Sequence, residues 1–220
     1  SGSTASGDGG FLVGSGSAYS ASAFVFDDSE DRYAYYHRVE NKTPFDLEYF
    51  NTITKGGIPN KTLNIALAGT GVGKSLFMCH VASSALVDGR NVLYITMEMA
   101  EEKIAERIDA NLLNIPIDQL ENTPKTIFTD KVKKLSTKTN GKLIIKEYPT
   151  GSAHAGHFRA LLNELKLKRQ FEPDIIFVDY LNICASSRMK GMGGAINSYN
   201  YIKAIAEELR GLAVEFDVPV

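Results

Sequence analysis

The sequence lacks several features that would assign the protein to a particular class. Only two cysteines occur among its 220 residues, Cys79 and Cys184, and each stands among apolar neighbours. We expect buried thiols in a reducing compartment, because a metal site needs more ligands at ligand spacing. No apolar run approaches the roughly 18 residues that cross a bilayer, and no basic-then-apolar secretion signal opens the chain. We therefore expect a cytoplasmic protein without a membrane partner.

The sequence also lacks a strong excess of charge of either sign. Its formal net charge is -2, from 24 basic and 26 acidic residues. Any site for a polyanion must therefore be a local patch, because the protein as a whole has no attractive field for one. The length allows one good-sized globular domain with extensions.

The N-terminal part has little that could form a core. Residues 1–24 are rich in Ser, Gly and Ala, so we interpret them as a flexible linker or a remnant of expression, outside the fold. In the following region, 25–44, Tyr33, Tyr36 and Val39 recur at helical spacing, which predicts a short amphipathic helix over about 28–40. Its apolar stripe would pack either on its own domain or on a neighbouring subunit.

From residue 45 to 220, apolar strand-like runs alternate with helical patterns. We expect strands at 62–68, 91–97, 142–148 and 174–181, and helical segments at 74–89, 100–114, 117–138, 155–170 and 198–216. Several strands are continuously apolar, which is typical of strands covered on both faces. This pattern predicts an α/β fold with a mostly parallel sheet flanked by helices. Because "VPV" at 218–220 begins what resembles a further strand, we expect the domain to be incomplete at its C-terminus.

The most informative stretch is "ALAGTGVGKS", which lies between a predicted strand and a predicted helix. It matches the P-loop pattern G-x-x-x-x-G-K-[ST], except that Ala68 replaces the first glycine. Glycines allow backbone amides to surround a phosphate, and the helix that follows presents its positive end to it. We expect ATP to contact Ala68, Gly69, Thr70, Gly71, Val72, Gly73, Lys74 and Ser75. An ordinary glycine-rich turn would explain the glycines but not the lysine and the serine.

Two carboxylates complete the predicted site. Asp179 ends the apolar strand "IIFVD", the arrangement in which an acidic residue holds Mg²⁺ together with Ser75. Glu98 follows the strand 91–97, and the carboxyl ends of parallel strands meet at one edge of a sheet. We interpret Glu98 as the general base that orients water, with Lys74 on the β- and γ-phosphates. The alternative role of Glu98, a carboxylate at a helix N-terminus, is already filled by Glu101 and Glu102.

Together these stretches resemble the RecA-like ATPase core of DnaB-type replicative helicases, in particular the T4-phage type. The resemblance is carried by "KGGIPNKTLNIALAGTGVGKSLFMCHVA", "NVLYITMEMAEEKIAERI", "PDIIFVDYLNI" and "YIKAIAEELRGLAVEFDVPV". It covers residues 45–220 and implies a P-loop NTPase that hydrolyses ATP with Mg²⁺. It also implies a homo-oligomer, a hexameric ring around single-stranded DNA, with a primase and a helicase loader as partners.

The resemblance further implies that DNA is bound between the strand of Asp179 and the next helix. There the sequence reads "ASSRMKGMGGAINSYN", where Arg188 and Lys190 stand among glycines and suit a phosphate backbone. A solvated loop is the alternative interpretation. The family places its γ-phosphate sensor and its arginine finger beyond Val220. We therefore expect this chain to bind nucleotide but to hydrolyse it slowly.

Two other functions remain compatible with these residues. A recombinase-like ATPase would use ATP to control an open filament on DNA without unwinding it. A non-enzymatic assembly module would use ATP as a structural clamp and would have no DNA partner. Closed rings separate the helicase from the filament, and salt-sensitive binding of single strands separates both from the clamp.

Overall fold

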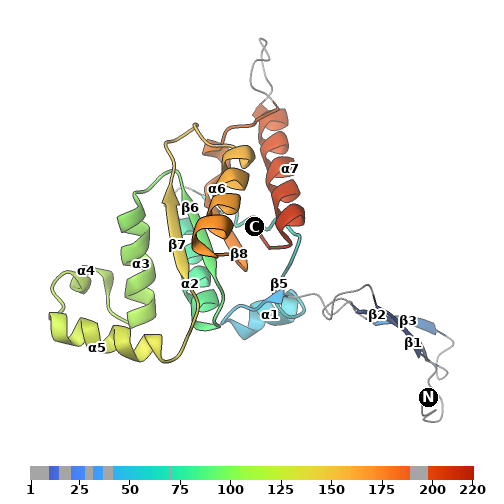
Figure 1. Ribbon diagram of the computed structural model, residues 1–220, viewed down its shortest axis with the longest axis horizontal. Helices are drawn as coiled ribbons and strands as arrows, with labels where there is room; N and C mark the ends of the chain where they lie inside the picture. The colour runs from blue at the N-terminus through green and yellow to red at the C-terminus, as the bar shows by residue number, and fades with distance from the viewer. Residues whose placement is uncertain (1–9, 15–20, 28–31, 37–41, 70, 189–197) are drawn as a thin grey trace. The chain divides into compact units, whose positions relative to one another are not determined.

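The computed structural model describes residues 10–14, 21–27, 32–36, 42–69, 71–188 and 198–220. The chain divides into two compact units, Ser1–Lys42 and Thr43–Val220. Figure 1 labels most of the elements of both units.

The first unit contains a small antiparallel sheet with strand order β1-β2-β3. Its strands are β1 (Gly10–Gly14), β2 (Ala21–Asp27) and β3 (Arg32–Tyr36). The helix predicted over 28–40 is therefore wrong, and two of these strands begin inside the stretch 1–24 that was expected to lie outside any fold. The segments "AFVF" and "RYAYY" consist largely of aromatic and β-branched residue types, which favour strands.

The second unit is built on a parallel sheet with strand order β7-β6-β8, as the sequence predicts. Its strands are β6 (Val92–Thr96), β7 (Leu143–Glu147) and β8 (Ile175–Asp179). Thr96 is the register partner of both Glu147 and Asp179. The carboxyl ends of all three strands therefore lie at one edge of the sheet.

Helices follow each strand of this sheet (Figure 1). The larger ones are α2 (Lys74–Val87), α3 (Glu101–Leu113), α5 (Lys125–Ser136), α6 (Ala155–Arg169) and α7 (Ser198–Phe216). Shorter elements are α1 (Glu48–Ile53), α4 (Ile117–Leu120) and the 3-10 turn η1 (Leu181–Ile183), with β4 (Lys42–Thr43) and β5 (Ile58–Pro59) paired in a two-stranded sheet. Each helical region predicted after residue 70 is present.

The sheet separates two hydrophobic cores because its side chains alternate between its faces. Leu93 and Ile95 of β6 face the core formed with α6 and α7, whereas Val92 and Tyr94 face the core formed with α2 and α3. All four side chains are fully buried. The second unit is thus a three-layer α/β/α structure, which explains why β6 reads as a continuous apolar run.

The expected strand at 62–68 is wrong as a strand, although its first residues do join the sheet. Backbone amides link residues 62–64 to the segment 218–220, which in turn bonds to β8 through the amide of Ile176 and the carbonyl of Pro219 (3.0 Å). Beyond Asn64 this pairing ends, and the side chains of Ile65 and Leu67 are 62% and 94% exposed. Among the described residues no strand lies beside 65–68, since the backbone–backbone hydrogen bonds of this part involve only residues 61–64.

Within the described residues, no helix is long and apolar enough to span a membrane. Cys79 and Cys184 are buried free thiols, as predicted. Burial raises the pKa of Cys79 and raises that of Cys184 to about 12. Both side chains act as small apolar groups in their cores.

Candidate nucleotide-binding site

The glycine-rich loop leads directly into the N-terminus of α2. Gly73 is the residue before the helix and has φ of 106°, and Gly71 has φ of 73°. Both values lie in the left-handed region that favours glycine. Among the described residues, no side chain caps the N-terminus of α2, and its first turn has no acidic residue. The first turn of α3, in contrast, contains Glu101 and Glu102. The first amides of α2 are therefore left for an external anion.

The ammonium group of Lys74 folds back over the loop. Its Nζ donates hydrogen bonds to the carbonyl oxygens of Ala68 and Gly69, both at 3.0 Å. Ser75 follows in the first turn of α2 with a half-buried side chain. Val72 lies exposed on the loop, and Thr70 lies outside the described residues. The lysine therefore lies over the loop, where two uncharged carbonyl oxygens accept its hydrogen bonds in place of a phosphate.

Asp179 occupies the end of β8 and is 1% exposed. Its Oδ2 accepts a hydrogen bond from the hydroxyl of Tyr94 on β6 (3.0 Å), whereas its Oδ1 is buried and has no partner among the described residues. Burial of Tyr94, together with the nearby Cys79 and Asp179, raises the pKa of this phenol, which therefore stays a neutral donor. A buried carboxylate oxygen without a donor fits a cation or its water shell.

Glu98 lies two residues beyond the end of β6 and has an exposed side chain. The turn that presents it is closed by Thr96, whose Oγ1 donates to the carbonyl of Met99 (2.8 Å) and accepts from the Met99 amide (3.2 Å). Since Thr96 and Asp179 are register partners, Glu98 and Asp179 emerge at the same edge of the sheet. Helix α2 packs on β6 and β8, so the helix that begins with Lys74 and Ser75 covers these two strands.

The predicted DNA-binding residues are only partly described. Arg188 follows η1, and its Nη1 forms an ion pair with Oε2 of Glu207 on α7 (2.9 Å). Lys190 lies outside the described residues.

His154 and His157 lie between β7 and α6 and cap the N-terminus of α6, where Nδ1 of His154 accepts a hydrogen bond from the Gly156 amide (3.0 Å). In the described part of the chain, no group of three or more His, Cys, Asp or Glu side chains could hold a metal.

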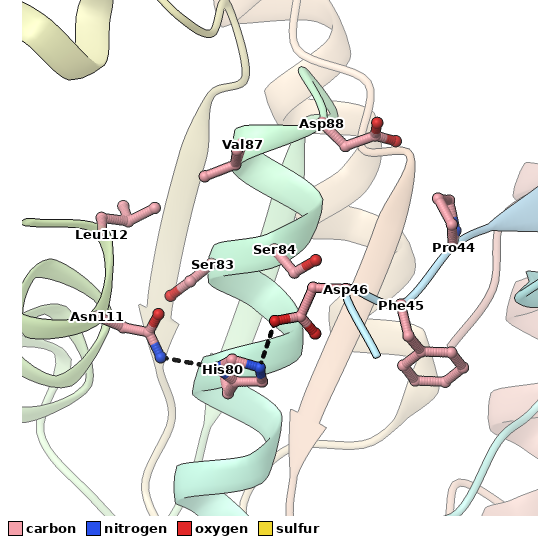
Figure 2. A pocket seen from close by; sticks show the side chains of 10 residues that line it. All are labelled: Pro44, Phe45, Asp46, His80, Ser83, Ser84, Val87, Asp88, Asn111 and Leu112. Carbon is pink, nitrogen blue, oxygen red and sulfur yellow. Dashed lines mark hydrogen bonds and ion pairs between the residues drawn. The ribbon is translucent and has the colours of Figure 1, made fainter. Parts of the chain in front are cut away.

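A cavity of about 380 Å³ lies elsewhere, between residues 44–46, the C-terminal half of α2 and the end of α3 (Figure 2). His80 lines it, with Nε2 at 2.7 Å from Oδ2 of Asp46 and Nδ1 at 2.9 Å from Nδ2 of Asn111. None of the described residues of the loop 68–75 lines this cavity. We therefore place the candidate nucleotide site at the loop and the sheet edge and not in the cavity.

The parallel sheet with helices on both faces and the glycine-rich loop that leads into α2 define an α/β fold of the RecA-like class. A family model described as the DnaB-like helicase C-terminal domain matches residues 44–220. The chain belongs to this family, as the sequence motifs predict.

Curated relatives support the same assignment. The DnaB-like replicative helicase of Enterobacteria phage T4 is 52% identical over 192 residues, which are 86% of this chain and 40% of that protein. A probable plasmid replicative DNA helicase of Chlamydia psittaci is 28% identical over 84% of this chain and 41% of its own length. The chain thus spans about two fifths of these relatives.

Solved structures share the fold. A DnaB-like replicative helicase, studied with its interactions with primase, superimposes with a TM-score of 0.64 at 17% identity, over 82% of this chain and 42% of that one. A second solved structure, of an ATPase domain, superimposes with a TM-score of 0.63, also at 17% identity, over 82% of this chain and 62% of that one. At this level of identity these likenesses concern the fold alone.

Sequence reasoning missed three side chains that the structure places near predicted functional residues. Tyr94 bonds to Asp179, and Glu207 and Glu208 of α7 contact the segment that contains Arg188. A tyrosine in a strand buried on both faces signals that its hydroxyl needs a partner. Which carboxylate it finds depends on strand register, which the sequence alone does not specify.

Proposed function

We propose that this chain is the ATPase domain of a DnaB-type replicative helicase, which binds ATP with Mg²⁺ and couples its hydrolysis to movement along single-stranded DNA. The observation that carries the proposal is the buried Asp179, whose Oδ1 has no partner among the described residues, at the same sheet edge as Glu98 and beneath the helix that begins with Lys74. Family membership supports it, since relatives over most of this chain are replicative helicases.

The residues of the loop would hold the polyphosphate. Amides of the loop and of the first turn of α2 would donate to phosphate oxygens, and Lys74 would exchange its two carbonyl partners for the β- and γ-phosphates. Ser75 and Asp179 are the side chains that would hold Mg²⁺, directly or through water. When bound, Mg²⁺ supplies neutralisation of the phosphate charge.

Glu98 would accept the proton of the attacking water. Its exposed carboxylate lies on a turn closed by Thr96, so the side chain points from a fixed position at the sheet edge. A positioned general base of this kind contributes roughly 10² to 10⁴ in rate.

In the intact protein we propose a hexameric ring around single-stranded DNA, with primase and a helicase loader as partners, in the cytoplasm of a bacterial or phage-infected cell. Arg188 and Lys190 would contact the DNA backbone. The recombinase-like filament and the nucleotide-dependent clamp are the alternatives that experiment must separate.

Equilibrium binding of a fluorescent ATP analogue and of labelled oligo-dT tests the proposal. We expect Mg²⁺-dependent nucleotide binding, and single-strand binding that weakens as salt rises. Nucleotide binding without any single-strand binding would favour the clamp, and open filaments in electron micrographs would favour the recombinase. Absence of nucleotide binding would contradict all three functions.

A further inference from the structure

The segment that contains Arg188 is held at its start by one carboxylate of α7. Glu208 is 9% exposed, and its Oε1 accepts from the hydroxyl of Ser186 (2.7 Å) and from the Arg188 amide (3.3 Å). Its Oε2 accepts from the amide (3.2 Å) and the hydroxyl (2.9 Å) of Ser187. Burial alone would raise the pKa of Glu208, but these hydrogen bonds hold it below its ordinary value. Residues 186–188 are therefore anchored to α7 by a charged acceptor.

The chain between Asp179 and this segment is also held by backbone hydrogen bonds. It includes η1 and bonds to the segment 151–153, through Gly151 N to Ile183 O (2.9 Å) and Ala185 N to Ala153 O (2.7 Å). The hydroxyl of Tyr201 on α7 accepts from the Ser186 amide (3.2 Å). The backbone at Arg188 is therefore held in place. Its side chain can reach only the groups near this position.

The partner of the Arg188 side chain is Glu207, the residue next to Glu208 on α7. Its Oε2 lies 2.9 Å from Nη1 of Arg188, and the two side chains are 50% and 60% exposed. An ion pair this exposed contributes little to stability and exchanges readily with solutes. The two neighbouring carboxylates thus differ: Glu208 is a buried anchor, whereas Glu207 is an accessible counter-charge.

We propose that Glu207 occupies the place of a nucleic-acid phosphate on Arg188, so that single-stranded DNA must displace this carboxylate to bind. The inference rests on the proposed function, because it takes the phosphodiester backbone as the ligand. A guanidinium presents a fork of donors that matches phosphate oxygens, and Glu207 engages it through Nη1. Glu207 thereby lowers the affinity for DNA, while Glu208 keeps Arg188 where DNA can reach it.

The test compares Glu207→Gln with Glu215→Gln in otherwise complete protein. Glu215 is a matched control, since it lies on α7, is 43% exposed and pairs with Arg159 through Oε2 at 2.8 Å. Both variants remove one negative charge from the same helix. Anisotropy of labelled oligo-dT, at about 0.1 M salt with a non-hydrolysable ATP analogue, should show Glu207→Gln binding about twofold to fivefold more tightly than Glu215→Gln.

The same pair is then made in an Arg188→Gln background. We expect the advantage of Glu207→Gln over Glu215→Gln to disappear, because the group that Glu207 shields is absent. Equal affinities of the two single variants, or an advantage that persists without Arg188, would overturn the inference. Failure of the unchanged protein to bind oligo-dT in a salt-sensitive way would overturn the proposed function itself, which is a distinguishable result.

Discussion

The two segments that form the candidate nucleotide site are held in different ways. Asp179 ends a strand of the sheet that lies between two layers of helices, is 1% exposed, and accepts a hydrogen bond from Tyr94 on one oxygen. The segment 65–69 runs without strand pairing to the described chain, and Leu67 is 94% exposed. The fold therefore positions Asp179, the carboxylate proposed to hold Mg²⁺, before any ligand arrives. The lysine of the loop, in contrast, bonds to carbonyl oxygens of the loop itself, and under the proposed function it would exchange these bonds for phosphate.

The largest effect should come from the sheet edge. Glu98→Gln keeps the shape of the side chain but removes the base, so we expect ATP turnover to fall by about 10² to 10⁴ with nucleotide affinity unchanged. Long incubations with radiolabelled ATP measure the turnover. Glu102→Gln, another exposed acid in the first turn of α3, is the control and should retain the original rate. Equal turnover of the two variants would remove Glu98 from the catalytic role.

The second prediction compares how much a side chain of the buried sheet and one of the exposed segment contribute to the free energy of unfolding. Leu93→Ala should lower the free energy of unfolding by about 2–5 kcal/mol, because it leaves a cavity in a fully buried site. Leu67→Ala should change it by less than about 0.5 kcal/mol, as expected for an exposed position. Urea unfolding followed by circular dichroism compares them. A large loss at Leu67 would show that the segment 65–69 is packed in solution.

A smaller effect concerns the hydroxyl that fixes Asp179. Tyr94→Phe leaves the buried Oδ2 without its donor, so we expect a loss of about 1–3 kcal/mol in the free energy of unfolding. Tyr148→Phe, a tyrosine packed against Phe158 in the other core, is the comparison and should cost less. Equal losses would mean that the Tyr94 hydroxyl contributes nothing particular to Asp179.

The smallest effect has the opposite sign. Asp179→Asn removes a buried carboxylate whose Oδ1 has no described partner, so it should stabilise the protein in Mg²⁺-free buffer by about 1 kcal/mol. In a domain of this size that corresponds to a melting temperature about 2–4 °C higher. The added stability from Mg²⁺ and nucleotide should be lost in the same variant. A lower melting temperature without Mg²⁺ would show that the carboxylate is satisfied in the free protein.

The comparison also shows what sequence patterns can predict. Strands β6 and β8 were predictable because continuous apolar runs indicate burial on both faces, and Asp179 stood at the end of such a run. In β7 only the first three residues are apolar, and all three are only half-buried. The segment 65–68 has a similar apolar pattern. A strand, however, needs a neighbouring strand to pair with, and the apolar pattern does not indicate whether such a neighbour is present. In the first unit, the prediction gave more weight to three residues at helical spacing than to the strand preference of the three tyrosines in β3.

In the candidate site, the residues that belong to local motifs were predictable, whereas the contacts between distant segments were not. The glycine-rich loop, Lys74 and Glu98 follow from local motifs and from the rule that parallel strands end at one edge. The bond from Tyr94 to Asp179 and the bonds from residues 186–188 to Glu208 join segments far apart in the chain. Those contacts depend on strand register and on how α7 packs, which local spacing does not determine.

The central claim is that the loop at 68–75 binds the polyphosphate through Lys74. The most direct test is the dissociation constant of ATP with Mg²⁺ for the unchanged protein and for Lys74→Ala, measured by calorimetry. Lys134→Ala, which removes an exposed cation from the last turn of α5, serves as the control. The account predicts a loss of affinity of about tenfold or more for Lys74→Ala and none for the control. Equal affinity of Lys74→Ala and the unchanged protein would contradict it.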